Sequence, residues 1–255
     1  MLFRSGDFDR TAISLGAVYT PEEDMSARLR LEYRIEDGEG VARDRETWGL
    51  SAGYENQVSD DWRLIADAEL LYSVSADDAY RNGEYLNASL GYAYRPVDNE
   101  KLNALVRVGY LVDLPGEDQI GADGTTDGPK HRSVSASIAA TYDIHRALTI
   151  GGKLGYRSSS VAERGSDDYT VNSATLLVGN LEWNAVGEWD IFAEGHVLYS
   201  PETGSTETGA VAAVYRHLGE NLKVGVGYEW GSVSDVETDL NYQGQGLFLN
   251  VIAKF

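Results

Sequence analysis

The sequence predicts an all-β fold, an antiparallel transmembrane β-barrel of about 12–14 strands, and three observations predict it. Apolar and polar residues alternate with a period of two through nearly all of the 255 residues. This is the side-chain period of a strand, and segments of about ten residues suit a tilted strand that crosses a bilayer. Short and long connections alternate between the segments, and aromatic residues gather at both ends of the apolar faces.

Thirteen segments show the alternation, and no helical stretch competes with them. In chain order, they begin near Thr11, Met25, Thr47, Trp62, Tyr85, Asn103, Val134, Thr149, Asn172, Asp190, Glu207, Leu222 and Gly244. The second, fourth, eighth and twelfth show the two faces well. Their apolar faces carry Leu29, Leu64, Leu154 and Val226, and their polar faces carry Arg30, Arg63, Lys153 and Lys223. We therefore expect the first set to face lipid and the second to face the interior.

The connections differ in length from one rim to the other. The short ones are residues 20–24, 57–61, 96–101, 144–148, 185–189 and 217–221. The long ones include residues 36–46, 114–132, 159–171 and 232–243. Short periplasmic turns and longer extracellular loops are typical of bacterial transmembrane barrels.

Aromatic residues form two sets at the ends of the apolar faces, as expected for rings at lipid headgroups. At the short-turn ends lie Tyr19, Tyr54, Trp62, Tyr94, Tyr142, Trp183, Tyr215 and Phe255. At the opposite ends lie Tyr33, Trp48, Tyr72, Tyr110, Tyr156, Tyr199, Tyr228 and Trp230. Ordinary aromatic enrichment in strands would not favour both ends of one face.

The chain ends in an alternating apolar face that closes on an aromatic residue. This face comprises Leu247, Leu249, Val251, Ala253 and Phe255. With the alternation and the aromatic girdles, it resembles bacterial outer-membrane β-barrel proteins across nearly the whole chain. The resemblance implies that this face is the insertion signal. It also implies a Gram-negative outer-membrane location, with membrane lipid, lipopolysaccharide and the barrel-assembly machinery as partners.

Residues 218–255 also look similar to the closing hairpin in the C-terminal barrel of large surface proteins. The chain shows no signal peptide, and the odd strand number departs from the even number of bacterial single-chain barrels. With a periplasmic C-terminus, the first strand would run from outside inward. We therefore expect residues 1–10 to be the remnant of an upstream loop or strand, residues 11–255 to be the barrel, and the signal peptide to be lost with the missing part. The alternative is a miscount at the marginal segment 207–216.

Composition excludes several classes of protein. The formal charge of −20 argues against nucleic acid, whose phosphates require Lys and Arg. The absence of Cys excludes disulfides and thiolate metal sites. The mean hydropathy of −0.33 does not exclude a barrel, because alternating strands lower the mean.

The polar face carries the candidate functional residues, which would line the lumen. The candidates are Arg28, Arg30, Arg34, Arg63, Asp67, Glu69, Arg107, Lys153, Arg157, Glu194, His196 and Glu229. They would form either a charge-selective constriction or a salt-bridged lining that fills a narrow barrel. His196, beside Glu194, is the one histidine on the lumen face, while His145 and His217 sit in short turns and His131 in a loop.

No spacing among these residues indicates a metal site, a catalytic motif or a cofactor. The acidic loops, with Asp113, Glu117, Asp118, Asp123 and Asp127 in one and Asp235, Glu237 and Asp239 in the other, are better interpreted as solvated surface than as calcium sites. We expect a protein that is not an enzyme. The favoured function is a membrane anchor or translocator-like domain of a larger cell-surface protein. The alternative is a porin-like channel for small solutes, and a barrel-embedded hydrolase is the least favoured.

Overall fold

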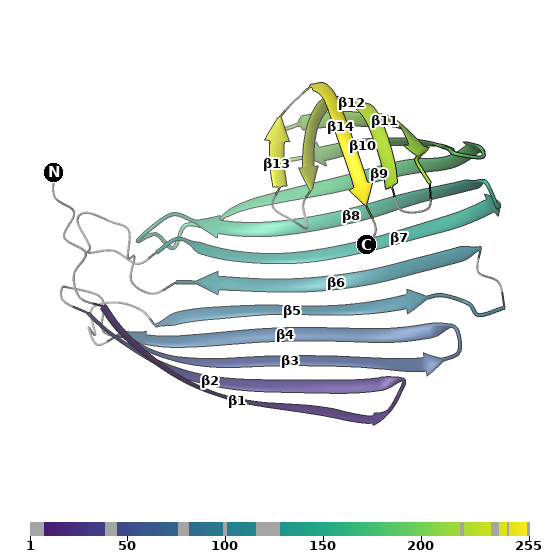
Figure 1. The fold of residues 1–255 in the computed structure, drawn as a ribbon. Helices are drawn as coiled ribbons and strands as arrows, with labels where there is room; N and C mark the ends of the chain where they lie inside the picture. Colours follow the sequence, from purple (N-terminus) through teal and green to yellow (C-terminus); the bar gives the residue numbers. More distant parts are fainter. Residues whose placement is uncertain are drawn as a thin grey trace.

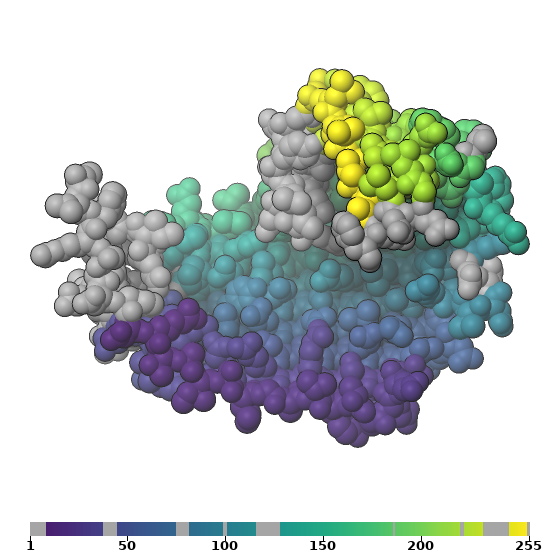
Figure 2. All heavy atoms as spheres, viewed as in Figure 1, coloured from purple at the N-terminus to yellow at the C-terminus, as the bar shows by residue number. Residues whose placement is uncertain are grey.

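The structure is a computed structural model, and its strands form one antiparallel sheet that curves around a hollow (Figures 1 and 2). It describes residues 8–38, 45–75, 82–98, 101–115, 128–219, 222–235, 240–243 and 245–253. Among these residues, no helix is long and apolar enough to cross a membrane.

Each strand pairs with its neighbours in chain order, so the sheet is a continuous meander. The strands are β1 (Phe8–Glu22), β2 (Met25–Gly38), β3 (Arg45–Ser59), β4 (Trp62–Ser75), β5 (Gly83–Tyr94), β6 (Leu102–Leu114), β7 (Lys130–His145), β8 (Leu148–Ala162), β9 (Thr170–Val186), β10 (Trp189–Ser200), β11 (Ser205–His217), β12 (Leu222–Asp235), β13 (Leu240–Gln243) and β14 (Gly246–Ala253).

The meander crosses thirteen times, because β13 and β14 both pair with the same side of β12 and together count as one crossing. β13 pairs with the end of β12, from Ser232↔Gln243 onward, and β14 pairs with the beginning, through Leu222↔Ala253. The marginal segment 207–216 is a full strand: β11 pairs with β10 from Ser200↔Ser205 to Trp189↔Arg216, and with β12. The odd number therefore does not come from a miscount there.

Tight hairpins join the strands at one rim, which we call the short-turn rim. Two residues connect β1 to β2, β3 to β4, β7 to β8 and β9 to β10. In the last of these, Gly187 has φ +54°, a left-handed conformation that glycine adopts without a steric penalty. Such turns fix the register of the hairpins and hence which side chains share a face.

The strands are longer than the sequence pattern indicated, and this shortens the loops. The expected loop 36–46 shrinks because β2 runs to Gly38 and β3 begins at Arg45. β7 begins at Lys130, so His131 lies in a strand rather than in a loop. The rule that connections are short at one rim and long at the other also has an exception. Residues 95–101 at the short-turn rim form a longer connection than residues 201–204 at the other, the long-loop rim.

The sheet has two free edges among the described residues. β1 pairs with β2 alone, and β14 pairs with β12 alone. Apolar side chains at the edges are the more exposed: Leu15 of β1 is 72% exposed and Leu249 of β14 is 73%, against 50% for Leu154 in the middle. Since strands alternate in direction, thirteen crossings leave β1 and β14 running the same way. Figure 1 shows them on opposite sides of the opening, in purple and yellow.

Candidate functional site

One face of the sheet carries most of its charged strand residues, and we call it the inner face. Directly paired residues on neighbouring strands share a face, so the register traces it around the sheet. One such row runs Arg28, Gly53, Asp67, Ser89, Gly109, Ser135, Arg157. The same registers place all twelve lumen-lining candidates on the inner face: Arg28, Arg30, Arg34, Arg63, Asp67, Glu69, Arg107, Lys153, Arg157, Glu194, His196 and Glu229.

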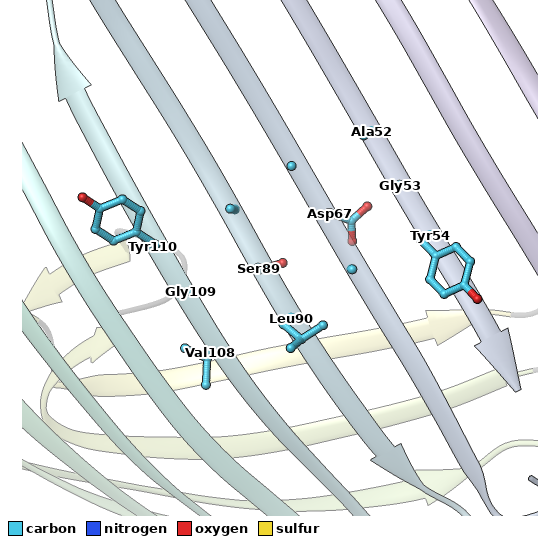
Figure 3. Close-up of a pocket in the computed structure, with 12 residues that line it drawn as sticks. Ala52, Gly53, Tyr54, Asp67, Ser89, Leu90, Val108, Gly109 and Tyr110 are labelled. Carbon is cyan, nitrogen blue, oxygen red and sulfur yellow. The ribbon is translucent and has the colours of Figure 1, made fainter. Parts of the chain in front are cut away.

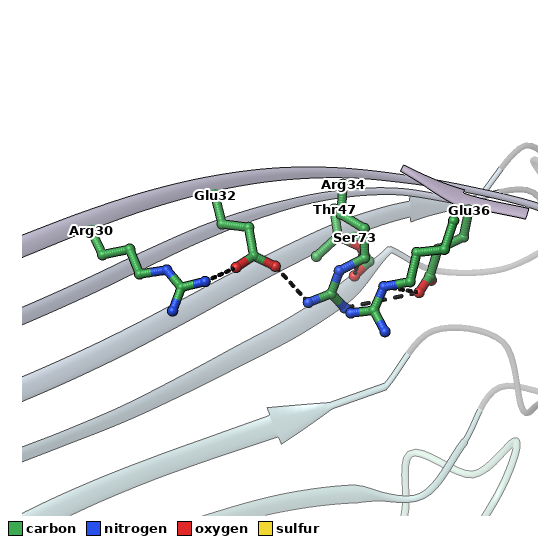
Figure 4. A network of polar contacts seen from close by, with 7 residues as sticks. Arg30, Glu32, Arg34, Glu36, Thr47 and Ser73 are labelled. Atoms are coloured by element: carbon green, nitrogen blue, oxygen red, sulfur yellow. Dashed lines mark hydrogen bonds and ion pairs between the residues drawn. The ribbon is translucent and has the colours of Figure 1, made fainter. Parts of the chain in front are cut away.

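An ion-pair ladder runs along the inner face of β1 and β2 toward the long-loop rim (Figure 4). Glu32 accepts from Arg30 at 2.8 Å and from Arg34 at 2.6 Å. Glu36 Oε1 lies 3.9 Å from Arg34 Nη1 and 3.6 Å from Arg10 Nε. In Figure 4 the labelled side chains of this ladder, from Arg30 to Glu36, lie on the concave side of the arched strands. Alternating charges satisfy one another, so this part of the wall is a salt-bridged lining.

The middle of β2–β4 holds a longer-range pair that depends on a glycine. Arg28 Nη2 lies 2.5 Å from Asp67 Oδ1, although the two residues are on strands separated by β3. Gly53 lies between them in register, and a Cβ there would come within 2.3 Å of Arg28 Nε. Because Gly53 has no side chain, the Arg28 side chain can extend across β3 to Asp67. Nearby, Arg63 donates to Glu55 at 2.7 Å.

The inner wall of β5–β9 is hollowed and rich in hydroxyl groups. A cavity of about 460 Å³ is lined by Arg107, Lys153, Arg157 and several serines of β5 and β7. A neighbouring cavity of about 740 Å³ reaches Glu194 and His196 of β10, and a third of about 600 Å³ lies between β1 and β6. Figure 2 shows the hollow between the N-terminal and C-terminal strands.

The sequence analysis missed a charge cluster around a buried carboxylate at the short-turn rim. Asp190 Oδ2 lies 2.7 Å from His217 Nε2 and 2.5 Å from Lys223 Nζ. The Asp190 side chain is 8% exposed, so its charge is stabilised by close partners rather than by water. The three residues come from β10, β11 and the start of β12, and a linear sequence carries no signal for their convergence.

Tyr215 was expected among the outward girdle residues, and the structure places it on the inner face. Its register partner on β10 is Asp190, and Lys223 Nζ lies 4.8 Å from its ring centroid. A Cβ on Gly225 would come within 2.2 Å of that ring, and one on Gly227 within 2.3 Å of the Phe248 ring. The ring of Tyr215 therefore turns inward, because Gly225 leaves room for it and Asp190 and Lys223 surround it.

The opposite, outer face is apolar, as the alternation predicted. It carries Leu29, Leu154 and Val226, and the C-terminal residues Leu247, Leu249, Val251 and Ala253, all exposed. The end of that C-terminal face, Phe255, lies outside the described residues. Over β3–β6, alanines leave a shallow outer hollow between Tyr54, Leu90 and Tyr110 (Figure 3).

Aromatic rings cluster at both ends of the outer face. Trp48 lies 5.3 Å from Tyr33 and 6.4 Å from Tyr72 between ring centroids, at the long-loop end. Trp62 lies 4.6 Å from Tyr92 and 4.7 Å from Tyr94 at the short-turn end. Aromatic side chains in such belts suit the interface between hydrocarbon and water.

The four histidines occupy different parts of the sheet. His196 is buried on the inner face of β10, His131 Nε2 lies 3.4 Å from Arg157 Nη2, and His145 Nδ1 accepts from the Ala147 amide. Among the described residues, no group of three His, Asp or Glu side chains is placed to share a metal ion. Of the acidic loops, Glu117, Asp118, Asp123, Asp127, Glu237 and Asp239 lie outside the described residues.

Comparison with known proteins supports the fold. A family model described as "Putative MetA-pathway of phenol degradation" matches residues 32–164. No curated protein matches the chain. The siderophore receptor PirA from Pseudomonas aeruginosa is 12% identical, with a TM-score of 0.62 over 88% of this chain and 41% of that chain.

The outer membrane channel DcaP of Acinetobacter baumannii is 11% identical, with a TM-score of 0.57 over 96% of this chain and 85% of that chain. The FrpB iron transporter from Neisseria meningitidis is 11% identical, with a TM-score of 0.62 over 90% and 46%. The chain thus spans less than half of the two receptor and transporter chains. At these identities the likeness shows the fold alone, and it confirms the predicted all-β, antiparallel β-barrel fold.

Proposed function

The chain belongs to the family described as "Putative MetA-pathway of phenol degradation", and from this premise we propose that it forms a porin-like channel for small polar solutes in the outer membrane. The observation that carries the proposal is the pairing of an apolar outer face with a charged inner face that is hollowed from β1 to β10. The apolar outer face suits contact with lipid hydrocarbon, and the charged inner face suits the passage of water-soluble molecules.

The proposed channel needs one strand beyond those described. β1 and β14 run in the same direction, so joining them directly would create a parallel seam in an antiparallel barrel. Leaving them unpaired would expose backbone N–H and C=O groups to lipid, at several kcal/mol per group. We propose that a strand of opposite direction, from elsewhere in a longer polypeptide, lies between the two edges and closes the barrel.

We place the short-turn rim in the periplasm and the long-loop rim outside the cell, following the usual asymmetry of these barrels. In this orientation the ion-pair ladder of β1 and β2 lies toward the outer mouth, and the Asp190 cluster lies at the periplasmic mouth. The open edges also favour the second candidate function, an anchor or translocator-like domain of a larger surface protein. An anchor needs no open lumen, so conductance separates the two functions.

Conductance of the full-length protein in planar bilayers tests the channel. We expect stepwise currents in KCl whose size scales with salt concentration, as for a water-filled pore. A barrel that inserts and resists heat denaturation in detergent, yet carries no current, would rule out the channel and leave the anchor.

Disulfide trapping tests the closing strand, because the chain has no cysteine of its own. Leu249→Cys with Val226→Cys is the positive control, since the two residues are cross-strand partners and should oxidise. Leu15→Cys is combined in turn with a cysteine at Leu247, Leu249 or Val251. With a strand between the edges, the Cα atoms lie about 10 Å apart, too far for a disulfide. Oxidation of any edge pair in the full-length protein would show direct closure.

A further inference from the structure

We propose that Arg107, Lys153 and Arg157 form a binding subsite for small organic carboxylates on the inner face of β6–β8. The proposal rests on the channel proposed above and names the class of solute it would prefer. The chain as a whole carries 41 acidic residues against 21 basic ones. The lining of this cavity reverses that balance, with three cations and a single carboxylate, Asp113.

The register places the three cations around one small area of the inner face, centred on Ser137 and Gly155, which we call the cavity floor. Arg107 of β6 pairs with Ser137 of β7, and Ser137 pairs with Gly155 of β8. Lys153 and Arg157 lie two residues to either side of Gly155 on the same face. Arg107 is therefore about 10 Å across the sheet from β8, and the two β8 cations are about 13 Å apart along it. Long side chains from all three positions extend over the same floor.

A glycine occupies the position between Lys153 and Arg157 on this face. Gly155 carries no side chain there, and a Cβ at that position would lie 3.8 Å from Leu176 Cβ. Ser133, Ser135 and Ser137 also line the cavity and offer hydroxyl donors. A carboxylate lodged there would accept from guanidinium, ammonium and hydroxyl groups together, which are the donors that stabilise it best.

The contacts of the two arginines place their donors beside polar groups of the cavity wall. Arg107 Nη2 donates to Ser89 Oγ at 3.4 Å, and Arg157 Nε donates to Ser159 Oγ at 3.0 Å. Arg157 Nη2 also lies 3.4 Å from His131 Nε2. Tyr85, Leu111 and Leu176 also line the cavity. These residues suit the apolar body of an organic acid better than an inorganic anion.

Calorimetric titration of the folded full-length protein with sodium benzoate tests the subsite, with benzamide as the neutral probe of the same shape. We expect benzoate to bind more tightly than benzamide. Arg107→Gln, Lys153→Gln and Arg157→Gln should each weaken benzoate about fivefold, as for partly solvated charge pairs. Arg157→Lys, which keeps the charge, should retain most of the affinity. Rising salt should weaken benzoate and leave benzamide unchanged.

Arg146→Gln is the matched control, because it removes the same charge from the exposed turn between β7 and β8. It should leave benzoate affinity unchanged. Equal affinity for benzoate and benzamide, or equal losses in Arg146→Gln and the three cavity variants, would overturn the subsite. If the pore conducts but the cavity variants bind benzoate normally, the subsite alone fails. If the protein never conducts, the channel fails, while the titration still decides the subsite.

Discussion

An arginine introduced on the outer face should destabilise the folded barrel far more than an arginine introduced at the same depth on the inner face. Leu90 is 51% exposed on the outer face near the middle of β5, between Ala66 and Val108 in register. Arg at the midplane of a lipid-facing strand costs about 2–4 kcal/mol. Leu90→Arg should therefore lower the folding equilibrium constant in liposomes about 30- to 700-fold, at a factor of ten per 1.4 kcal/mol.

The neighbouring residue supplies the control. Ser89 points to the inner face, opposite Asp67, so Ser89→Arg places the same side chain beside a carboxylate and water. Near the long-loop rim, Ile35→Arg on the outer face should cost only about 0–1 kcal/mol, because the charge can reach the headgroups. Urea titration of the full-length protein in liposomes, followed by heat-modifiable gel mobility, measures all three. Equal losses for Leu90→Arg and Ser89→Arg would refute the assignment of faces.

Three further predictions concern packing, the turn at residues 201–204 and insertion. Gly225→Val should reduce the folded yield, because its side chain would strike the Tyr215 ring, and adding Tyr215→Ala should restore the yield; failure of this rescue would contradict the proposed clash. Ser173 Oγ donates to Glu202 at 2.7 Å, and this hydrogen bond holds the Glu202 pKa below its ordinary 4.5. The stabilisation is therefore present above that ordinary value and is lost as the pH falls through the lower folded pKa. Hydrogen exchange at residues 201–204, corrected for intrinsic rates, should rise over that window in the native protein and show no such rise in Ser173→Ala. Deleting Phe255 should impair assembly into outer membranes far more than Lys254→Gln does, since the terminal aromatic residue resembles an insertion signal; equal amounts of assembled barrel would contradict it.

The sequence by itself determined the fold class and the two faces. A strand has only two sides and a period of two, so the alternation of Leu29 with Arg30, or of Leu154 with Lys153, assigns each side chain before any contact is known. A lipid environment strengthens this rule, because a charge on the wrong side is costly. The number of crossings followed from the same pattern.

The tertiary structure alone decided which residues meet across the sheet. Arg28 reaches Asp67 only because the registers of two hairpins align Gly53 between them. Asp190 joins His217 and Lys223, and Arg107 lies across β7 from Gly155, between Lys153 and Arg157, by the same kind of alignment. Tyr215 was misassigned because its inward position depends on the space above Gly225. Register depends on turn geometry and on the pairing of whole strands, and these are properties of the assembled sheet rather than of any one segment.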